Sequence, residues 1–225
     1  MTAPNRPNPP QGGGDTPKQT LCFDEAAHRY SVNGKIIPSV TQIISAVGLY
    51  EFDFVSRQTL AIAAERGRIV HTYIEWYEQG CLDENSIDPD LAGYFEAYLA
   101  AKAAGELPEA PTAIEKRVYS EKYQYAGTLD QLFGERWIHD HKTGVESPTH
   151  GLQLSGYWLA LHPDLRDKPD RLTCGYYANT GEYRIVEYPY EPLAWLSVVA
   201  DFGWRRKNNC IKPIWQETAP LWATA

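Results

Sequence analysis

The stretch WIHDHKTG, residues 137–144, contains four consecutive side chains that can exchange protons or bind cations: His139, Asp140, His141 and Lys142. Such a run could be a metal site, a charged turn or a chance grouping. If residues 136–142 form a β-strand, successive side chains point to opposite faces, so the four groups cannot converge on one site. Asp140 and Lys142 then share one face, with Cα atoms about 7 Å apart, and the two histidines pack on the other. The strand hypothesis therefore selects Asp140 and Lys142 as the chemically useful pair.

A second carboxylate lies ten residues before this pair. The segment GTLD ends in Asp130, and Gly134-Glu135 supplies a turn signal between the two acids. A hairpin of this length can bring Asp130 and Asp140 side by side. Two adjacent carboxylates raise each other's pKa unless a cation neutralises them. Hard oxygen ligands suit Mg²⁺ or Mn²⁺, and such an ion lowers the pKa of bound water and stabilises charge on a phosphoryl oxygen.

The same spacing also fits a plain hairpin with two exposed acids neutralised by a lysine, and spacing alone does not decide between the two. Gly127 favours the chemical interpretation, because a residue without a side chain would let a nucleic-acid backbone approach closely. The net charge of −8 argues against a passive DNA-coating module, which is usually basic. It leaves open an enzyme with an acidic, metal-filled site and a local basic groove, for which the candidate cations are Arg66, Arg68, Lys116, Arg117 and residues 205–207.

Turn and cap signals place the elements of the first half of the chain. Asn33-Gly34 predicts a hairpin within residues 21–40, and a short helix follows and ends at Gly48. Helical apolar spacing runs from about Ser56 to Gly80. A second helix has Asp88 as its N-cap, with Pro89 at its first position and Gly105 after its last turn.

The second half of the chain begins with three segments rich in aromatic and β-branched residues, which predict consecutive strands at 112–120, 123–134 and 136–144. A helix at 149–163 follows and stops at Pro163. A hairpin then turns at residues 179–181, and a last helix begins near Pro192. This order predicts one α/β domain with a mixed central sheet and helices on both faces.

The amino-acid composition limits the possible domain organisation and cellular location. Residues 1–20 are rich in Pro, Gly and Asn, so we expect a disordered N-terminal tail followed by a single domain at 21–225. The tail lacks the apolar core of a signal peptide, and no apolar run approaches the roughly 20 residues that span a bilayer. We therefore expect a cytoplasmic protein with no membrane partner. The four cysteines have no CxxC pair, which favours free thiols over a zinc site.

The motifs AGTLD and HDHKTG resemble those of the PD-(D/E)xK nuclease superfamily, whose core is a helix, a three-stranded unit, a helix and a further strand. RGRIVH, ending at His71, and QLSGY, with Gln153 and Tyr157, are similar to two motifs of its RecB-like branch, which includes phage and bacterial exonucleases. HRYSVNGKIIPSVTQII is similar to the entry segment of phage-encoded members. The resemblance covers roughly residues 22–205, in the family's order. It implies a restriction-endonuclease-like α/β core.

The resemblance also implies roles for individual residues. Asp130 and Asp140 would be the metal-binding carboxylates and Lys142 the catalytic lysine, exposed in the site and dispensable for folding. His71 would be an extra metal ligand, with Gly67 one turn earlier letting its helix approach the sheet. Gln153 and Tyr157 lie four apart on one helix face and would hold the scissile phosphate or the lysine, although Tyr157 also fits simple packing. Glu115 would bind a second metal or pair with a neighbouring cation.

These roles favour an Mg²⁺- or Mn²⁺-dependent deoxyribonuclease that acts on double- or single-stranded DNA ends in phage or bacterial DNA recombination or repair. An exonuclease is preferred. The alternatives are a structure-specific endonuclease on the same core and a non-catalytic DNA-end-binding scaffold. A recombination or single-strand-binding protein is the candidate partner. Some relatives carry an iron–sulfur cluster on one cysteine before the core and three after it, but no third cysteine follows this core, so no cluster is expected.

Overall fold

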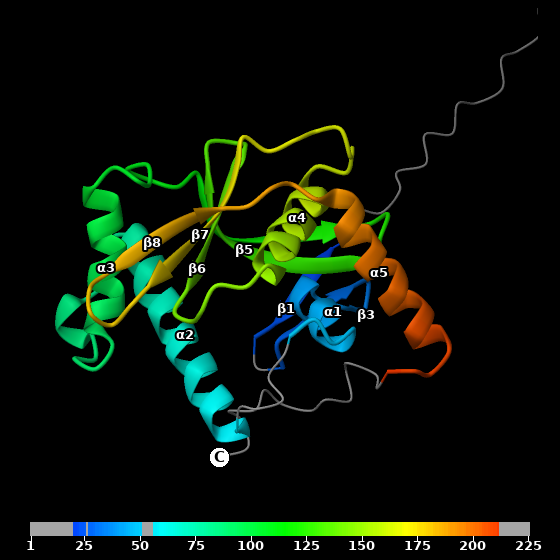
Figure 1. The fold of residues 1–225 in the computed structure, drawn as a ribbon, viewed down its shortest axis with the longest axis horizontal. Helices are drawn as coiled ribbons and strands as arrows, with labels where there is room; N and C mark the ends of the chain where they lie inside the picture. The colour runs from blue at the N-terminus through cyan, green and yellow to red at the C-terminus, as the bar shows by residue number, and fades with distance from the viewer. Residues whose placement is uncertain (1–19, 26, 51–55, 212–225) are drawn as a thin grey trace, which may run out of the picture.

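A five-stranded mixed sheet forms the centre of the molecule (Figure 1). The computed structural model describes residues 20–25, 27–50 and 56–211, so nearly all of the tail expected at 1–20 lies outside the described residues. The strands follow the order of the chain and are β4 (Ala113–Ser120), β5 (Tyr125–Phe133), β6 (Trp137–Lys142), β7 (Arg171–Tyr177) and β8 (Tyr183–Glu187). All neighbours are antiparallel except β6 and β7, which are parallel and joined through helix α4 (Thr149–Leu161). The predicted α/β class and mixed central sheet are confirmed.

Helices cover the two faces of this sheet and form two separate apolar cores. On one face, α4 packs with α1 (Val40–Ala46) and α5 (Pro192–Lys207) in a core that includes Ile43, Leu154 and Trp195. On the other, α2 (Arg57–Glu78) and α3 (Ala92–Ala103) form a core around Val70 and Phe95. The order of α3, three strands, α4 and a further strand is the order that the resemblance implied.

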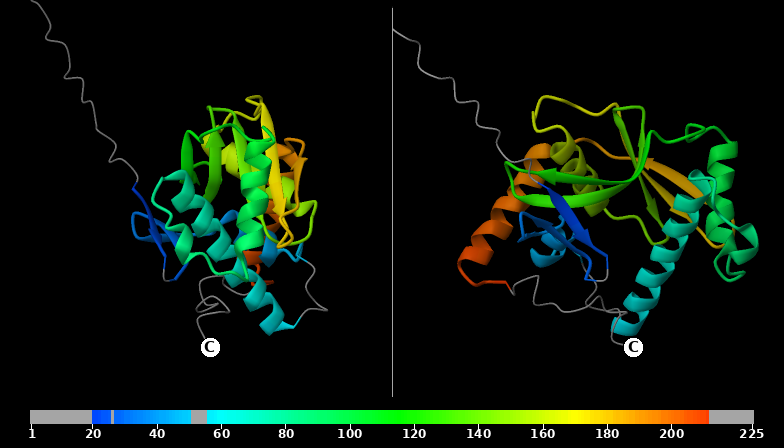
Figure 2. Two further views of the ribbon diagram at one scale, coloured as in Figure 1. Left: turned by 90° about the vertical axis from the view of Figure 1, so that its left-hand side faces the viewer. Right: turned by 180° about the vertical axis from the view of Figure 1, so that it is seen from behind.

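The N-terminal segment forms a small sheet of its own. Its strands are β1 (Leu21–Asp24), β2 (Arg29–Val32) and β3 (Lys35–Ile37), one strand more than the predicted hairpin. Asn33 and Gly34 both have positive φ, as the tight β2–β3 turn requires. The peptide N–H of Ala126 donates to the Pro38 carbonyl at 2.9 Å, which fastens this segment to β5. Figure 2 shows the small sheet, in blue, beside one end of the central sheet.

Most predicted helix ends are confirmed, and side-chain caps fix the starts of α1 and α2. The Ser56 side chain accepts a hydrogen bond from the Thr59 N–H and caps α2, and Gly80 follows this helix with a φ of +70°. The predicted start of α3 is wrong. The Asp88 carboxylate accepts from the Asp90 N–H and stabilises a turn, so the helix begins only at Ala92. A short 3₁₀ turn, η1 (Glu84–Ser86), precedes it.

No helix in the described part of the chain has both the length and the apolar character needed to cross a bilayer.

Candidate active site

Three acidic residues occupy matching positions on β4, β5 and β6. Gln131 pairs with Ile114 on one side and with His139 on the other. One residue further along, the same register places Glu115, Asp130 and Asp140 in one row across the strands. The hydrogen-bonded ladder skips Glu115 and Asp130 and resumes between β4 and β5 at Lys116. The three predicted carboxylates thus meet where the sheet is locally open.

The backbone is distorted at this row. Glu115 has a φ of +46°, a left-handed conformation that costs a non-glycine residue about 1–2 kcal/mol. In β5, strict alternation would put Tyr125 and Gln131 on one face. Instead, the Tyr125 hydroxyl donates to the Gly156 carbonyl of α4, and the Gln131 amide donates to the Tyr98 hydroxyl of α3. The alternation therefore slips by one residue near Asp130. The slip directs the Asp130 carboxylate into the gap between β5 and β6.

The peptide groups of His141 hold two of the site residues. Its N–H donates to Asp130 Oδ2 at 2.7 Å, and its carbonyl lies 2.9 Å from Nε2 of His71, which α2 supplies. A carbonyl can only accept, so Nε2 carries the proton. The other ring nitrogen, Nδ1, faces Asp130 Oδ2 at 3.4 Å. This is the arrangement of a metal-binding histidine, whose far nitrogen is fixed by a backbone acceptor.

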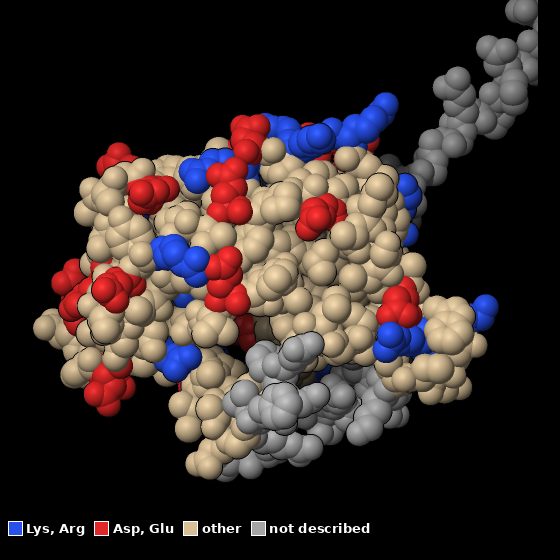
Figure 3. All heavy atoms as spheres, viewed as in Figure 1, with Lys and Arg blue, Asp and Glu red and all other residues tan. Residues whose placement is uncertain are grey.

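His71, Glu115 and Asp130 form a cluster that could hold a metal ion. Each offers one ligand atom, and these atoms all lie within 4.8 Å of one another. One imidazole and two carboxylates suit a divalent cation with a preference for oxygen ligands. Figure 3 shows acidic atoms recessed in a hollow near the middle of one face of the molecule.

Asp140 lies beside this cluster rather than within it. Its Oδ2 makes an ion pair with Lys142 Nζ, and its Oδ1 accepts from the Gln153 amide at 3.1 Å. Apart from Lys142, no donor among the described residues reaches the buried Oδ2 atom. A cation in the adjoining cluster would complete its surroundings, so the residues present fit a divalent ion.

Gln153 links the lysine, the aspartate and the tyrosine of the predicted motif. Its Oε1 lies 3.4 Å from Lys142 Nζ, and its amide also donates to the Tyr157 hydroxyl at 3.0 Å. Both residues come from α4, which packs directly over this part of the sheet. Direct contacts join the predicted residues into two groups: His71 with Asp130, and Gln153 with Asp140, Lys142 and Tyr157. The strand register connects the two groups, because it places Glu115, Asp130 and Asp140 in one row.

Burial and neighbouring charges shift the pKa values of the three acids in different directions. Burial, and then the charge of Asp130, raises the pKa of Glu115 to about 8 and that of Asp140 to about 6. The pKa of Asp130 itself is lowered: burial would raise it, but the charge and hydrogen bond of His71 outweigh burial. Burial likewise opposes the charged form of His71, yet Asp130 raises its pKa to about 9. Bound protons on these residues thus offset negative charge that a divalent cation would otherwise neutralise.

Lys142 differs from its expected state. Its side chain is 19% exposed and is paired with the buried Asp140, so it is not the exposed lysine that was expected. Burial would lower the pKa of Lys142, but Asp140 raises it above the usual value for lysine. The ammonium group therefore stays charged beside Asp140.

Two glycines have roles other than those expected. A Cβ on Gly127 would lie 2.5 Å from the Tyr157 ring, so this glycine makes room for Tyr157 and not for a nucleic-acid backbone. A Cβ on Gly67 would meet only Thr143 Oγ1, at an ordinary 3.6 Å, so the approach of α2 does not depend on it. Arg66 does more to hold α2 there: it donates to the Thr143 carbonyl at 3.2 Å.

His139 and His141 point away from Asp140 and Lys142, as strand alternation predicts. Their rings contact Tyr177, and His141 also packs against Tyr98 of α3. Sequence reasoning missed that the backbone of His141 nevertheless belongs to the site. The identity of a side chain carries no signal for a role of its peptide group.

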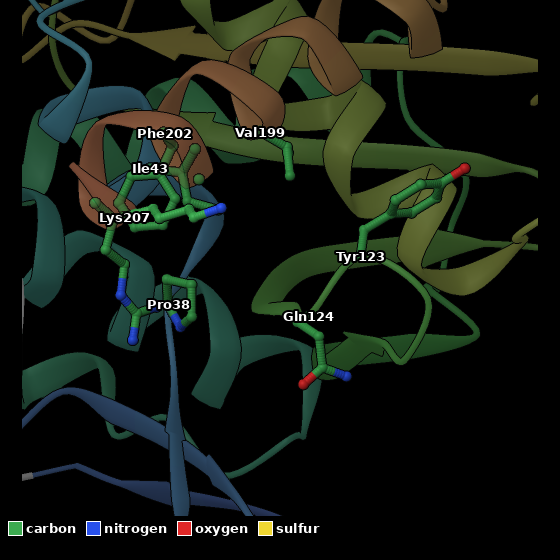
Figure 4. Close-up of a pocket in the computed structure, with 9 residues that line it drawn as sticks. Pro38, Ile43, Tyr123, Gln124, Val199, Phe202 and Lys207 are labelled. Carbon is green, nitrogen blue, oxygen red and sulfur yellow. The ribbon is translucent and has the colours of Figure 1, made fainter.

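A separate pocket of about 430 Å³ shares no lining residue with the site (Figure 4). It lies between α1, the β4–β5 turn and the end of α5, and it includes Arg206 and Lys207. Other cations expected in a basic groove make ion pairs with neighbours: Arg68 with Glu65, Arg117 with Glu25 and Arg205 with Asp201.

Comparison with known proteins finds likenesses among solved structures. No family model matches this chain, and no curated protein sequence matches it. Among solved structures, it is similar to one described as a "Putative exonuclease" from Eubacterium rectale, with a TM-score of 0.44 and 16% sequence identity over 80% of this chain and 78% of that one. A function for the present chain must be argued from the geometry of its own residues.

Proposed function

We propose that this protein is a divalent-metal-dependent deoxyribonuclease that hydrolyses phosphodiester bonds, acting as an exonuclease in phage or bacterial DNA recombination or repair in the host cytoplasm. One observation carries the proposal. Three carboxylates on adjoining strands lie with a histidine and a largely buried lysine, at a point where the sheet ladder opens. A structural hairpin has no need to bury like charges, whereas metal-assisted phosphoryl transfer does.

The metal ligands would be His71, Glu115 and Asp130, with Asp140 completing the set. Mg²⁺ and Mn²⁺ suit these ligands, because oxygen donors predominate. Such an ion, when bound, activates a water molecule and stabilises charge on the scissile phosphate. The chain has already arranged the histidine for this purpose: the His141 carbonyl fixes the proton on Nε2 and leaves Nδ1 toward Asp130.

The remaining residues hold the lysine in position and neutralise charge on the scissile phosphate. Lys142 remains protonated because Asp140 raises its pKa, so it acts as a fixed positive charge for a phosphoryl oxygen and not as a base. Gln153 contacts both Lys142 and Asp140 and keeps the lysine from swinging into solvent. The Tyr157 hydroxyl in turn accepts from the Gln153 amide, which fixes the amide's orientation.

DNA is the proposed partner, and the choice of exonuclease over endonuclease follows the family resemblance of the motifs. A non-catalytic DNA-end-binding scaffold is the rival. Closely placed carboxylates repel phosphate, so a protein that only binds DNA would gain nothing from them.

The test is a gel assay on matched end-labelled linear, covalently closed circular and single-stranded DNA, each with Mg²⁺, Mn²⁺ or EDTA. The proposal expects mononucleotides or short products from linear DNA, an intact circle and no cleavage in EDTA. Asp130→Asn should be inactive with either ion, and Asp201→Asn on the surface of α5 is the matched acidic control. Cleavage of the circle would identify an endonuclease. Binding of ends without cleavage under any condition would identify the scaffold.

A further inference from the structure

A buried polar chain lies behind β6, on the face turned away from Asp140. The Tyr177 hydroxyl lies 3.1 Å from His139 Nε2 and 3.4 Å from His141 Nδ1. His139 Nδ1 lies 2.8 Å from Thr173 Oγ1, which also accepts from Trp137 Nε1 at 2.7 Å. Both histidines, Thr173 and Tyr177 are at most 3% exposed. Buried polar groups on adjoining strands need partners, and these contacts supply one to every side-chain nitrogen and oxygen atom of the four residues except His141 Nε2.

The hydroxyl group is the link between the two histidines. A phenol has one proton to donate and lone pairs to accept, so it can accept from one ring while it donates to the other. Its position is fixed by Gly175, which pairs with His141 in the β6–β7 register. A Cβ on Gly175 would clash with the Tyr177 hydroxyl and lie 2.9 Å from His139 Nε2. The absence of a side chain at residue 175 is therefore what allows the hydroxyl to lie between the rings.

This network of buried polar groups reaches the candidate metal centre through His141. The ring of His141 contacts Tyr177 and Tyr98, and it lies edge-on to the His71 ring, with the ring centroids 5.5 Å apart. The backbone N–H of His141 donates to Asp130, and its carbonyl accepts from His71. These two groups belong to the successive peptide units on either side of the His141 Cα, so the contacts that hold the ring also restrict both units. We propose that Tyr177 is a positioning residue for the metal centre: through His141 it sets the orientation of the backbone N–H and carbonyl that fix Asp130 and His71. This inference rests on the proposed metal-dependent function.

The neighbouring residue Tyr176 provides a matched control. Its hydroxyl is also buried and also contacts a histidine and a tyrosine, His150 Nδ1 and the Tyr188 hydroxyl, each at 2.6 Å. These partners lie on the α4 side of the strand and do not touch His141. Tyr177→Phe and Tyr176→Phe thus each remove one hydroxyl and two hydrogen-bonding contacts from adjacent positions of β7, and only the first should affect the metal ligands.

The experiment measures Mn²⁺ affinity by calorimetry and hydrogen exchange of the His141 amide by NMR, with melting temperatures for both variants. We expect Tyr177→Phe to weaken Mn²⁺ binding about tenfold, as for other outer-shell groups, and to speed exchange of the His141 amide. Tyr176→Phe should lower the melting temperature comparably but leave both other quantities unchanged. Equal Mn²⁺ affinity and equal amide exchange in the two variants would overturn the positioning role.

Two further outcomes keep the inference separate from the proposed function. If the wild-type protein itself binds no Mn²⁺, the metal centre is wrong, and the amide exchange of His141 still decides whether Tyr177 orders that peptide. If Tyr177→Phe does not fold, Thr173→Val tests the same chain from its far end, since it removes the partner of His139 Nδ1. It should weaken Mn²⁺ binding by less than Tyr177→Phe would, and an unchanged affinity would overturn the inference.

Discussion

The two faces of β6 use buried titratable groups in opposite ways. Toward α4, Asp140 and Lys142 are charged partners, and the pKa of Asp140 is raised to about 6. Toward α3, burial lowers the pKa of His139 to about 3, and the ring is neutral with a partner at each nitrogen. All three side chains belong to one run of four residues. The difference shows that the protonation state of such a group depends on the elements packed against it more than on the residue type.

The contrast has a physical cause. On the back face, toward α3, His139 has uncharged hydroxyl partners at both ring nitrogens, so its neutral form is satisfied and its charged form would only be desolvated. The front face, toward α4, carries Asp140, which adjoins Glu115 and Asp130 in the row across the strands, and neutral donors alone cannot satisfy three neighbouring carboxylates. The surroundings of His139 are therefore complete within the protein, whereas the carboxylates need a cation or extra protons.

The largest expected effect follows from removing the positive charge of Lys142, on the face of β6 that packs toward α4. Lys142→Ala should reduce cleavage by at least about 100-fold, since a charged donor near the developing phosphate charge is lost. It should also lower the free energy of unfolding by about 3–5 kcal/mol, because Asp140 is left buried without its partner. Single-turnover cleavage and urea titration measure the two effects.

A double variant separates the two losses. Asp140→Asn combined with Lys142→Met removes both charges and keeps similar volumes, so stability should return toward the wild-type value while cleavage does not. A wild-type cleavage rate in Lys142→Ala would mean that the charged face of β6 has no special role in cleavage.

The next effect is the pH dependence of metal binding. Glu115 and His71, with pKa values of about 8 and 9, are protonated at neutral pH, and metal ligands must be deprotonated. Binding of Mn²⁺ at pH 7 should therefore release up to two protons. Affinity should rise with pH until about 9, by about tenfold per unit for each proton displaced. Calorimetry in buffers with different ionisation enthalpies measures the release, and His71→Gln should reduce it by one. An affinity independent of pH would contradict the buried cluster.

The sequence predicted the arrangement of side chains along β6 better than it predicted the backbone around the carboxylates. Alternation along β6 correctly separated the histidines from Asp140 and Lys142, because this strand is regular. The hairpin spacing also placed Asp130 beside Asp140, but it could not predict the slip in β5 opposite the left-handed Glu115, which accompanies the hydrogen bond from the His141 N–H to the Asp130 carboxylate. Neither Asp130 nor Glu115 is a glycine or a proline, so the chain carries no local sign of the distortion. The turns and caps at Asn33-Gly34 and Ser56 were predictable because their chemistry is local.

The role of Gly127 was predicted wrongly for a similar reason. A glycine in a strand indicates that something approaches its backbone, but its neighbour is set by tertiary packing. In this chain the neighbour is Tyr157 of α4.

A smaller effect distinguishes the faces by acid stability. The folded pKa of His139 is below its unfolded value, so its contribution is fully present above about pH 6.5 and is lost as pH falls toward 3. The loss is about 1.4 kcal/mol per pH unit. Asp140 acts in the opposite sense, since its raised pKa lets the folded state bind a proton below about pH 6. His139→Gln should therefore flatten the fall in stability between pH 6 and 4, measured by urea titration. An unchanged slope would mean that His139 is not buried as a neutral ring.

The smallest effect tests how closely the front face is packed, and it uses the two glycines beside it. Gly67→Ala adds a methyl group at an ordinary contact distance from Thr143 inside a helix, so it should stabilise the fold by about 0.5–1 kcal/mol with cleavage retained. Gly127→Ala adds the same group against the Tyr157 ring, where it should destabilise by about 1–3 kcal/mol. It should also slow cleavage, because displacement of Tyr157 disturbs Gln153 and through it Lys142. Thermal melts and cleavage rates of the two variants are compared directly, each serving as the other's control. If Gly127→Ala is as stable and active as Gly67→Ala, Tyr157 does not hold Gln153 in place, and the front face is ordered by its charges alone.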